Sequence, residues 1–182
     1  MATAELKSSP VEAFIDCLHA CENDQQRIDC VQQNALSLDD LAQYHYFGTN
    51  SYGRNLVYHH PEFEVILMCW GPDQQSSAHD HNESLCVMKC IGGELEEQRY
   101  KANPTPQPLS KTELSILKAG QSCSITDEEG LHTVGNKTAE NACSLHVYFP
   151  PISSVSSFSI EDGKEKKLTS AFTSEYGVRI VS

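Results

Sequence analysis

The stretch from Ser76 to Cys90 reads SSAHDHNESLCVMKC, and it places His79 and His81 on either side of one aspartate. Side chains two residues apart on a β-strand point to the same face, so the two imidazoles lie together and Asp80 points away. Two imidazoles on one strand face are suited to chelating a metal ion. The next residues, HNES, are typical of a turn. A turn resets the alternation, so Cys86 can also face inward from the following strand.

A third imidazole is available in a separate stretch, EGLHTVGN, as His132. The pair plus this histidine predicts a metal site of three imidazoles without a carboxylate. Zinc, copper, nickel and iron all accept imidazole ligands, so the residues alone leave the metal open. Four other histidines are expected to be ordinary surface or core residues: His19, His45, His59 and His60.

Short apolar and alternating runs follow one another from Asn50 to the end, and Gly, Pro and Asn/Asp separate them. This spacing predicts many short β-strands. The first 46 residues instead carry helix signals, with Ser9 as an N-cap, Pro10 at the first helical position and Ser37 opening a further helix three residues before Asp40. The fold class is therefore mainly β: a small β-barrel or jelly roll with an N-terminal helical cap. We expect one domain over 1–182, with the cap over 1–46 and the barrel over 47–182.

The composition limits which kinds of partner and which cellular compartment we expect for the protein. The chain has 182 residues and a formal net charge of -12, which argues against binding to nucleic acid or to an anionic membrane surface. No apolar run is long enough to span a bilayer, and the first residues lack the pattern of a secretory signal. These features predict a cytoplasmic protein. Its eight cysteines are then expected to be free thiols, with Cys17 and Cys21 as small core residues on one helix face.

Four motifs resemble one known family. WGPDQQSSAHDHNESLCVMKCIGG resembles the first metal motif of the cupins, except that Cys86 replaces the glutamate ligand that most cupins carry. YGRNL, GLHTVGN and SLHVYFPP follow the pattern of the animal-type cysteine dioxygenases, and the ending DGKEKKLTSAFTSEYG is also similar to theirs. The resemblance to the cysteine dioxygenase family covers nearly the whole chain, with the motifs in the right order.

The resemblance implies an enzyme that binds Fe(II) through His79, His81 and His132. It implies L-cysteine and O₂ as substrates and cysteine sulfinic acid as the product, a step of cysteine catabolism and taurine biosynthesis. No external reductant is needed, which agrees with the absence of a nucleotide-binding signature from the sequence. We expect the protein to be a monomer.

The resemblance also assigns the pocket. Arg54 is expected to bind the substrate carboxylate through its planar guanidinium, with Tyr52 beside it. Ser144, His146 and Tyr148 alternate, so they share one strand face and can form a relay that holds the Tyr148 hydroxyl near the substrate. From the residues alone, a polar network that satisfies its own hydrogen bonds would be the preferred interpretation.

The resemblance implies a covalent thioether between the Cys86 sulfur and the ring of Tyr148. We expect their two strands to pack face to face at the pocket edge. The crosslink would hold the Tyr148 ring before substrate arrives.

Some positions depart from the family pattern, namely the GPDQQSS loop, Val155 and Ser170. They put substrate affinity in question more than the reaction. A dioxygenase for another small thiol, 3-mercaptopropionate, is the nearest alternative, although the resemblance favours cysteine because of Arg54 and Cys86. A non-catalytic metal-binding cupin would need neither Arg54 nor Tyr148. A zinc isomerase of the cupin class would keep the glutamate ligand.

Overall fold

The computed structural model describes residues 8–169 and 171–180, so Ser170, which departs from the family pattern, lies outside the described residues. Two α-helices come first, α1 (Pro10–His19) and α2 (Asp24–Gln33), followed by a short 3₁₀-helix, η1 (Ala42–Tyr44). The described strands are β1 (Gly53–His60), β2 (Phe63–Trp70), β3 (Ala78–His79), β4 (Leu85–Gly92), β5 (Glu94–Lys101), β6 (Ser110–Lys118), β7 (Ser122–Ile125), β8 (Leu131–Gly135), β9 (Ala142–Phe149), β10 (Ser154–Phe158), β11 (Glu165–Thr169), β12 (Ser174–Glu175) and β13 (Val178–Arg179).

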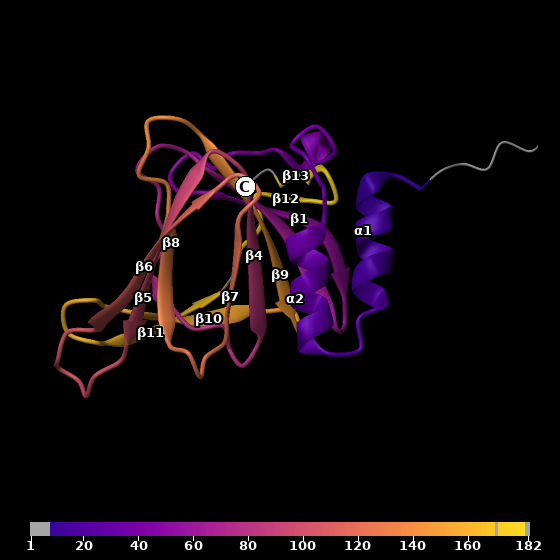
Figure 1. Cartoon of the computed structure of the whole chain (residues 1–182). Coiled ribbons are helices and arrows are strands. Elements are labelled where there is room, and N and C mark those ends of the chain that lie inside the picture. Colours follow the sequence, from indigo (N-terminus) through magenta and orange to yellow (C-terminus); the bar gives the residue numbers. More distant parts are fainter. Residues whose placement is uncertain (1–7, 170, 181–182) are drawn as a thin grey trace, which may run out of the picture.

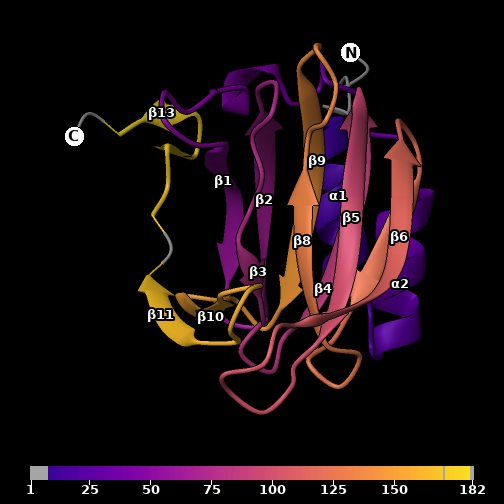
Figure 2. The ribbon, with the colours of Figure 1, turned by 90° about the vertical axis from the view of Figure 1, so that its left-hand side faces the viewer.

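The strands form two sheets that face each other. One sheet has the order β13-β12-β1-β2-β9-β4-β7, and the other has the order β11-β10-β3-β8-β5-β6. Figure 1 shows α1 and α2 outside the first sheet, and Figure 2, which views the second sheet, shows them behind both layers. The predicted fold class, mainly β of the jelly-roll type with N-terminal helices, is confirmed. None of the helices described here has the length and apolar character needed to cross a membrane.

The first helix begins as its sequence predicts. The Ser9 hydroxyl accepts from the Glu12 amide, the Glu12 carboxylate accepts from the Ser9 amide, and Pro10 occupies the first helical turn. This capping box satisfies donors that the helix itself leaves free. The buried side chains of α1 are Phe14, Ile15 and Leu18, which form one stripe against the sheet.

The helix predicted from Ser37 is wrong beyond its first turn. Ser37 and Asp40 do make the expected reciprocal hydrogen bonds, with the Ser37 amide 2.9 Å from Asp40 Oδ2 and the Asp40 amide 3.3 Å from Ser37 Oγ. The chain then forms turns and η1. Leu41 and Tyr44 are the buried residues here, and a three-residue spacing suits one 3₁₀ turn better than a longer α-helix.

The expectation of free thiols is wrong for Cys17 and Cys30, which form a disulfide between α1 and α2. Cys17 is exposed and is not a core residue. The two helices run as a hairpin that brings these Cα atoms within 6.4 Å, although the residues are 13 apart in sequence. Helical spacing within one segment shows which residues share a face, but it does not show which residue of the next helix comes opposite.

The central strands β2 and β9 are buried on both faces. On β2 the outward residues Phe63, Val65, Leu67 and Cys69 pack into the cluster beneath the helices. The inward residues of β2 that pack between the sheets are Ile66, Met68 and Trp70. On β9 the same alternation sends Leu145 and Val147 toward the helices, so that the polar residues between them face the interior.

Candidate active site

Three histidines from neighbouring segments meet at one place between the sheets. His79 on β3 and His132 on β8 are direct partners in the antiparallel ladder, and His81 follows β3. One ligand nitrogen from each ring lies within 4.8 Å of the others, and His81 Nε2 is 3.1 Å from His132 Nε2. The structure thus brings together all three imidazoles that the sequence pointed to.

In two of the rings Nδ1 makes a hydrogen bond, which leaves Nε2 free to bind a metal ion. His79 Nδ1 donates to the Ser77 carbonyl at 2.9 Å, and His132 Nδ1 donates to Glu97 Oε1 at 2.8 Å. Such outer partners set the tautomer of a metal-binding imidazole. The His81 backbone amide donates to Asp127 Oδ1 at 2.7 Å, which anchors the third residue.

Burial keeps these rings neutral. Desolvation lowers the pKa of His79, and it lowers the pKa values of His81 and His132 well below the ordinary value of 6.5, with neighbouring histidines adding to the effect. Neutral imidazole is the form that binds a metal ion. The donor set therefore fits a metal such as Fe(II), Zn²⁺ or Cu²⁺.

The turn between His81 and Cys86 is confirmed. Asn82 and Glu83 have φ values of 50° and 67°, a left-handed conformation that reverses the chain after His81. β4 then begins at Leu85 and carries Cys86 back into the interior, where the side chain is 1% exposed.

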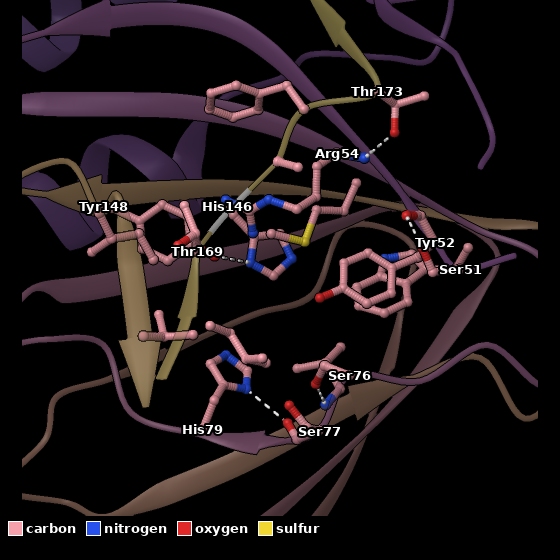
Figure 3. Close-up of a pocket in the computed structure, with 18 of the residues that line it drawn as sticks. Ser51, Tyr52, Arg54, Ser76, Ser77, His79, His146, Tyr148, Thr169 and Thr173 are labelled. Carbon is pink, nitrogen blue, oxygen red and sulfur yellow. Dashed lines mark hydrogen bonds between the residues drawn. The ribbon is translucent and has the colours of Figure 1, made fainter. Parts of the chain in front are cut away.

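A cavity of about 350 Å³ opens beside the histidines (Figure 3). His79 and His132 line it, whereas His81 lies behind them and is fully buried. Its other lining residues include Tyr52, Arg54, Met68, Trp70, His146, Tyr148, Val155 and Phe172. Val155, one of the departures from the family pattern, is thus part of the cavity wall.

Arg54 presents a guanidinium to this cavity. Its Nε and Nη2 atoms are buried and have no hydrogen-bond partner among the described residues. Phe172 lies against the guanidinium, with the Arg54 Cζ atom 5.8 Å from the ring centroid. The Thr173 hydroxyl accepts from the Arg54 amide at 3.1 Å, which fixes the C-terminal segment over β1. A buried guanidinium with free donors is suited to a carboxylate.

Ser144, His146 and Tyr148 share the inward face of β9 as predicted. Ser144 Oγ is 2.8 Å from His146 Nε2, and His146 Nδ1 is 3.4 Å from the Tyr148 hydroxyl. Trp70 extends this hydrogen-bond network, because its Nε1 donates to Ser144 Oγ at 2.9 Å. Tyr52 stacks on Trp70, with ring centroids 4.2 Å apart, so the network and the cavity wall share these aromatic rings.

Cys86 and Tyr148 are direct partners on the adjacent strands β4 and β9. The expectation that their strands pack face to face is wrong, because both strands belong to one sheet and pair by hydrogen bonds. Side chains of directly opposed residues lie close together on the same sheet face, with Cβ atoms about 4.5–5.5 Å apart. Desolvation raises the pKa values of the Cys86 thiol and of the Tyr148 hydroxyl, so both groups stay protonated in the resting site.

A family model described as cysteine dioxygenase type I matches residues 4–161. The chain belongs to the cysteine dioxygenase type I family. It is similar to curated proteins named cysteine dioxygenase type 1: it is 32% identical to the Homo sapiens protein over 97% of this chain and 92% of that one. Identity to the Rattus norvegicus protein is 36%, over 77% of this chain and 72% of that one. The protein is therefore an enzyme, a dioxygenase, as the sequence predicted.

Solved structures support the fold. A Klebsiella pneumoniae protein with a double-stranded β-helix domain covers 76% of this chain at a TM-score of 0.50 and 18% identity, with 98% of that protein covered. A Thermus thermophilus protein covers 63% of this chain at a TM-score of 0.51 and 22% identity, again with 98% of that protein covered. At these identities the likeness concerns the fold alone.

Sequence reasoning missed three residues that contact the histidine cluster or the β9 network: Glu97, Asp127 and Trp70. Glu97 had a usable signal, since it stands two residues after the apolar Leu95 on β5 and therefore shares its inward face. Asp127 lies in a turn after β7, and no local pattern shows that its carboxylate reaches the backbone of His81 and Glu83.

Proposed function

We propose that the protein oxidises L-cysteine with O₂ to cysteine sulfinic acid, using Fe(II) held by His79, His81 and His132. The observation that carries this proposal is one cavity lined by His79, His132 and Arg54, with His81 completing the imidazole cluster behind it. The Nε and Nη2 donors of Arg54 have no partner among the described residues. Membership of the cysteine dioxygenase type I family supports the same assignment. When bound, Fe(II) supplies the electron-transfer chemistry that lets O₂ react with the substrate sulfur.

Arg54 binds the substrate carboxylate. Its Nε and Nη2 donors are buried, so leaving them unpaired costs free energy that a carboxylate ligand removes. Tyr52 lies on the same wall of the cavity. A small amino acid anchored at Arg54 extends toward His79 and His132, which places its thiol at the imidazole cluster.

The network on β9 holds Tyr148 and points its proton into the cavity. Trp70 donates to Ser144, Ser144 donates to His146 Nε2, and His146 Nδ1 donates to the Tyr148 oxygen, which leaves the Tyr148 O–H free to donate to the substrate. Desolvation raises the pKa of Tyr148, so the hydroxyl keeps its proton, and it lowers the pKa of His146, so the ring stays neutral. A neutral donor at this position stabilises negative charge as it develops on the reacting atoms.

Cys86 forms a thioether with the Tyr148 ring in a two-electron oxidation. The S–H and one ring C–H are lost, a C–S bond forms, and O₂ accepts the two electrons and two protons. Their direct pairing on β4 and β9 supports this bond. The bond fixes the Tyr148 rotamer before substrate binds and removes a thiol that oxidation would otherwise modify.

The direct test is turnover. Iron-loaded protein is incubated with L-cysteine while O₂ consumption is followed and the sulfinate is measured by mass spectrometry. We expect one sulfinate for each O₂ consumed, and slower turnover of cysteamine, which has no carboxylate. Faster turnover of 3-mercaptopropionate than of L-cysteine would favour the alternative substrate, and O₂ loss without sulfinate would contradict the reaction. The cytoplasmic location, the monomeric state and the role in taurine biosynthesis stay predictions.

A further inference from the structure

A second group of metal-binding side chains lies on the opposite face of the first sheet. Cys69 on β2 and Cys143 on β9 are direct partners in the ladder, and their sulfurs are 3.8 Å apart. His45, which follows η1, brings its Nε2 within 3.2 Å of Cys143 Sγ. All three ligand atoms lie within 4.8 Å of one another. The neighbours Met68 and Ser144 point the other way and contribute to the interior between the sheets.

These separations are close to those of a tetrahedral zinc site. Zinc–sulfur bonds of about 2.3 Å at tetrahedral angles place two sulfurs roughly 3.8 Å apart. Zinc–nitrogen bonds of about 2.0–2.1 Å place an imidazole nitrogen about 3.5 Å from each sulfur. The pair of cysteines already has this spacing, and only the exposed His45 ring has to turn to complete it.

We propose that His45, Cys69 and Cys143 bind a second metal ion, Zn²⁺, with water in the fourth position. Binding releases the two thiol protons to solvent, so two thiolates balance the charge of the ion in an apolar setting. Sulfur ligands separate this site from the all-imidazole cluster, because thiolates select zinc over Fe(II). The exposed edge of His45 provides the route by which the ion enters.

A buried amide lies beside the two sulfurs. Asn55 is fully buried, and its Nδ2 donates to the Tyr46 and Leu67 carbonyls at 2.9 and 3.1 Å and lies 3.5 Å from Cys69 Sγ. Its Oδ1 accepts from the Ser174 hydroxyl at 2.8 Å. The Cys143 thiol donates toward Cys69 Sγ at 3.8 Å, so the two sulfurs are already in contact. An amide group at this distance is placed as an outer partner of a metal-binding sulfur would be.

Two buried thiols with an exposed imidazole above them are more than core packing. Cys69 and Cys143 belong to the apolar cluster beneath the helices, where valine or alanine would fill the same space. The His45 ring points onto this pair from the segment that leads to Tyr52 and Arg54. A bound ion would therefore tie that segment to β2 and β9 and stabilise the cavity wall from behind.

Cobalt is the probe for the test, because Co²⁺ takes zinc sites and gives an intense near-ultraviolet band only when thiolate binds it. Iron-loaded wild-type protein, under reducing anaerobic conditions, is titrated with Co²⁺ and then with Zn²⁺. We expect the thiolate band to saturate at one cobalt per chain and Zn²⁺ to abolish it. This measurement needs no variant, so a folding defect does not affect it.

Variants then locate the site. In protein carrying His132→Ala, which disables the imidazole cluster, the band should persist. Adding Cys143→Ala should abolish it, and adding Cys21→Ala, the same change at a free cysteine outside the proposed zinc site, should leave it intact. His45→Gln should weaken cobalt affinity about tenfold or more, since even the loss of an outer partner costs about 10–100-fold. Absence of a thiolate band, or an unchanged band after Cys143→Ala, would overturn the second site.

Discussion

The proposed role of Arg54 is to bind the substrate carboxylate in the cavity. Its guanidinium enters from β1 and lies under Phe172, and two of its nitrogens find no partner among the described residues. Buried donors without acceptors are rare in folded proteins and mark places where a ligand completes the bonding. The YGRNL motif points to this arginine in the sequence, and its free donors give a physical reason to expect carboxylate binding.

Replacing Arg54 by alanine tests this role. Truncating one partner of a buried charge pair costs on the order of 2–5 kcal/mol, so kcat/KM for L-cysteine should fall by about thirtyfold to several thousandfold. Turnover of cysteamine should change much less, because it has no carboxylate to lose. Steady-state O₂ uptake on both substrates measures the difference. Equal losses on both would show that Arg54 acts on folding or on the iron site instead.

Cys86 can be tested without kinetics. After incubation with iron, O₂ and L-cysteine, a tryptic digest should contain the Cys86 peptide joined to the Tyr148 peptide, lighter than their sum by two hydrogens. Cys86→Ser should keep iron and lose part of the activity, because Tyr148 remains but is less firmly held. A digest with no linked peptide after many turnovers would make Cys86 a packing residue.

At the scale of elements, β5 supports the ligand strand β8. Glu97 is 1% exposed, accepts from His132 Nδ1, and pairs with Arg99, whose Nε is 3.4 Å from Glu97 Oε2. Desolvation raises the pKa of the Glu97 carboxyl, and the Arg99 charge opposes that shift. The arrangement holds the His132 ring with Nε2 toward the other two imidazoles.

We therefore expect Glu97→Leu to lower iron affinity by about 10–100-fold, the usual cost of losing an outer partner of a metal ligand. Glu97→Gln keeps an acceptor for His132 and should lose less. Glu96→Gln, on the opposite face of β5, is the matched control. Competition with a chromophoric chelator measures the affinity. Identical affinities for the leucine variant and the control would remove Glu97 from the site.

Features that depend on residues close together in sequence could be predicted, whereas contacts between distant segments could not. The alternation of Ser144, His146 and Tyr148 and the turn after His81 are local, so strand geometry alone was enough to place those side chains. The Cys17–Cys30 bond, the Asp127 contact to His81 and the pairing of Cys86 with Tyr148 in one sheet depend on how distant segments pack. The pattern of residues within one segment does not show which residue of a distant segment lies opposite it. The 3₁₀ turn after Ser37 was missed because a capping signal starts a helix but does not decide its length.

At the scale of the whole molecule, the first sheet is packed on both of its faces. Its inner face carries the network that ends at Tyr148, and its outer face carries the cluster beneath α1 and α2. Because β2 and β9 are buried on both sides, strand positions are held firmly, which suits a site that needs side chains in fixed geometry.

Buried neutral histidines make stability depend on pH. Desolvation lowers the pKa values of His79, His81, His132 and His146 in the folded state, whereas the unfolded chain keeps values near the ordinary 6.5. Below that pH the unfolded state binds more protons, so stability is complete above about pH 6.5 and falls as the pH decreases. The raised pKa values of the Glu64 and Glu97 carboxyl groups have the opposite effect on stability, but these two groups are outnumbered by the four histidines.

The melting temperature of metal-free protein should therefore fall steadily as the pH is lowered from neutral toward about pH 5.5. Replacing His146, which is outside the imidazole cluster, by glutamine should flatten the curve. Differential scanning calorimetry at matched ionic strength measures both proteins. A melting temperature that stays constant or rises over this range would show that the histidines are not held neutral by the fold.

We propose that this pocket adds both atoms of one O₂ to the sulfur of L-cysteine. The most direct measurement is the mass of the sulfinate formed by iron-loaded protein under ¹⁸O₂ in ordinary water. Both sulfinate oxygens should carry the label, and His132→Ala should form almost no labelled product. Sulfinate with one oxygen from water, or doubly labelled sulfinate at the same rate from His132→Ala, would contradict it.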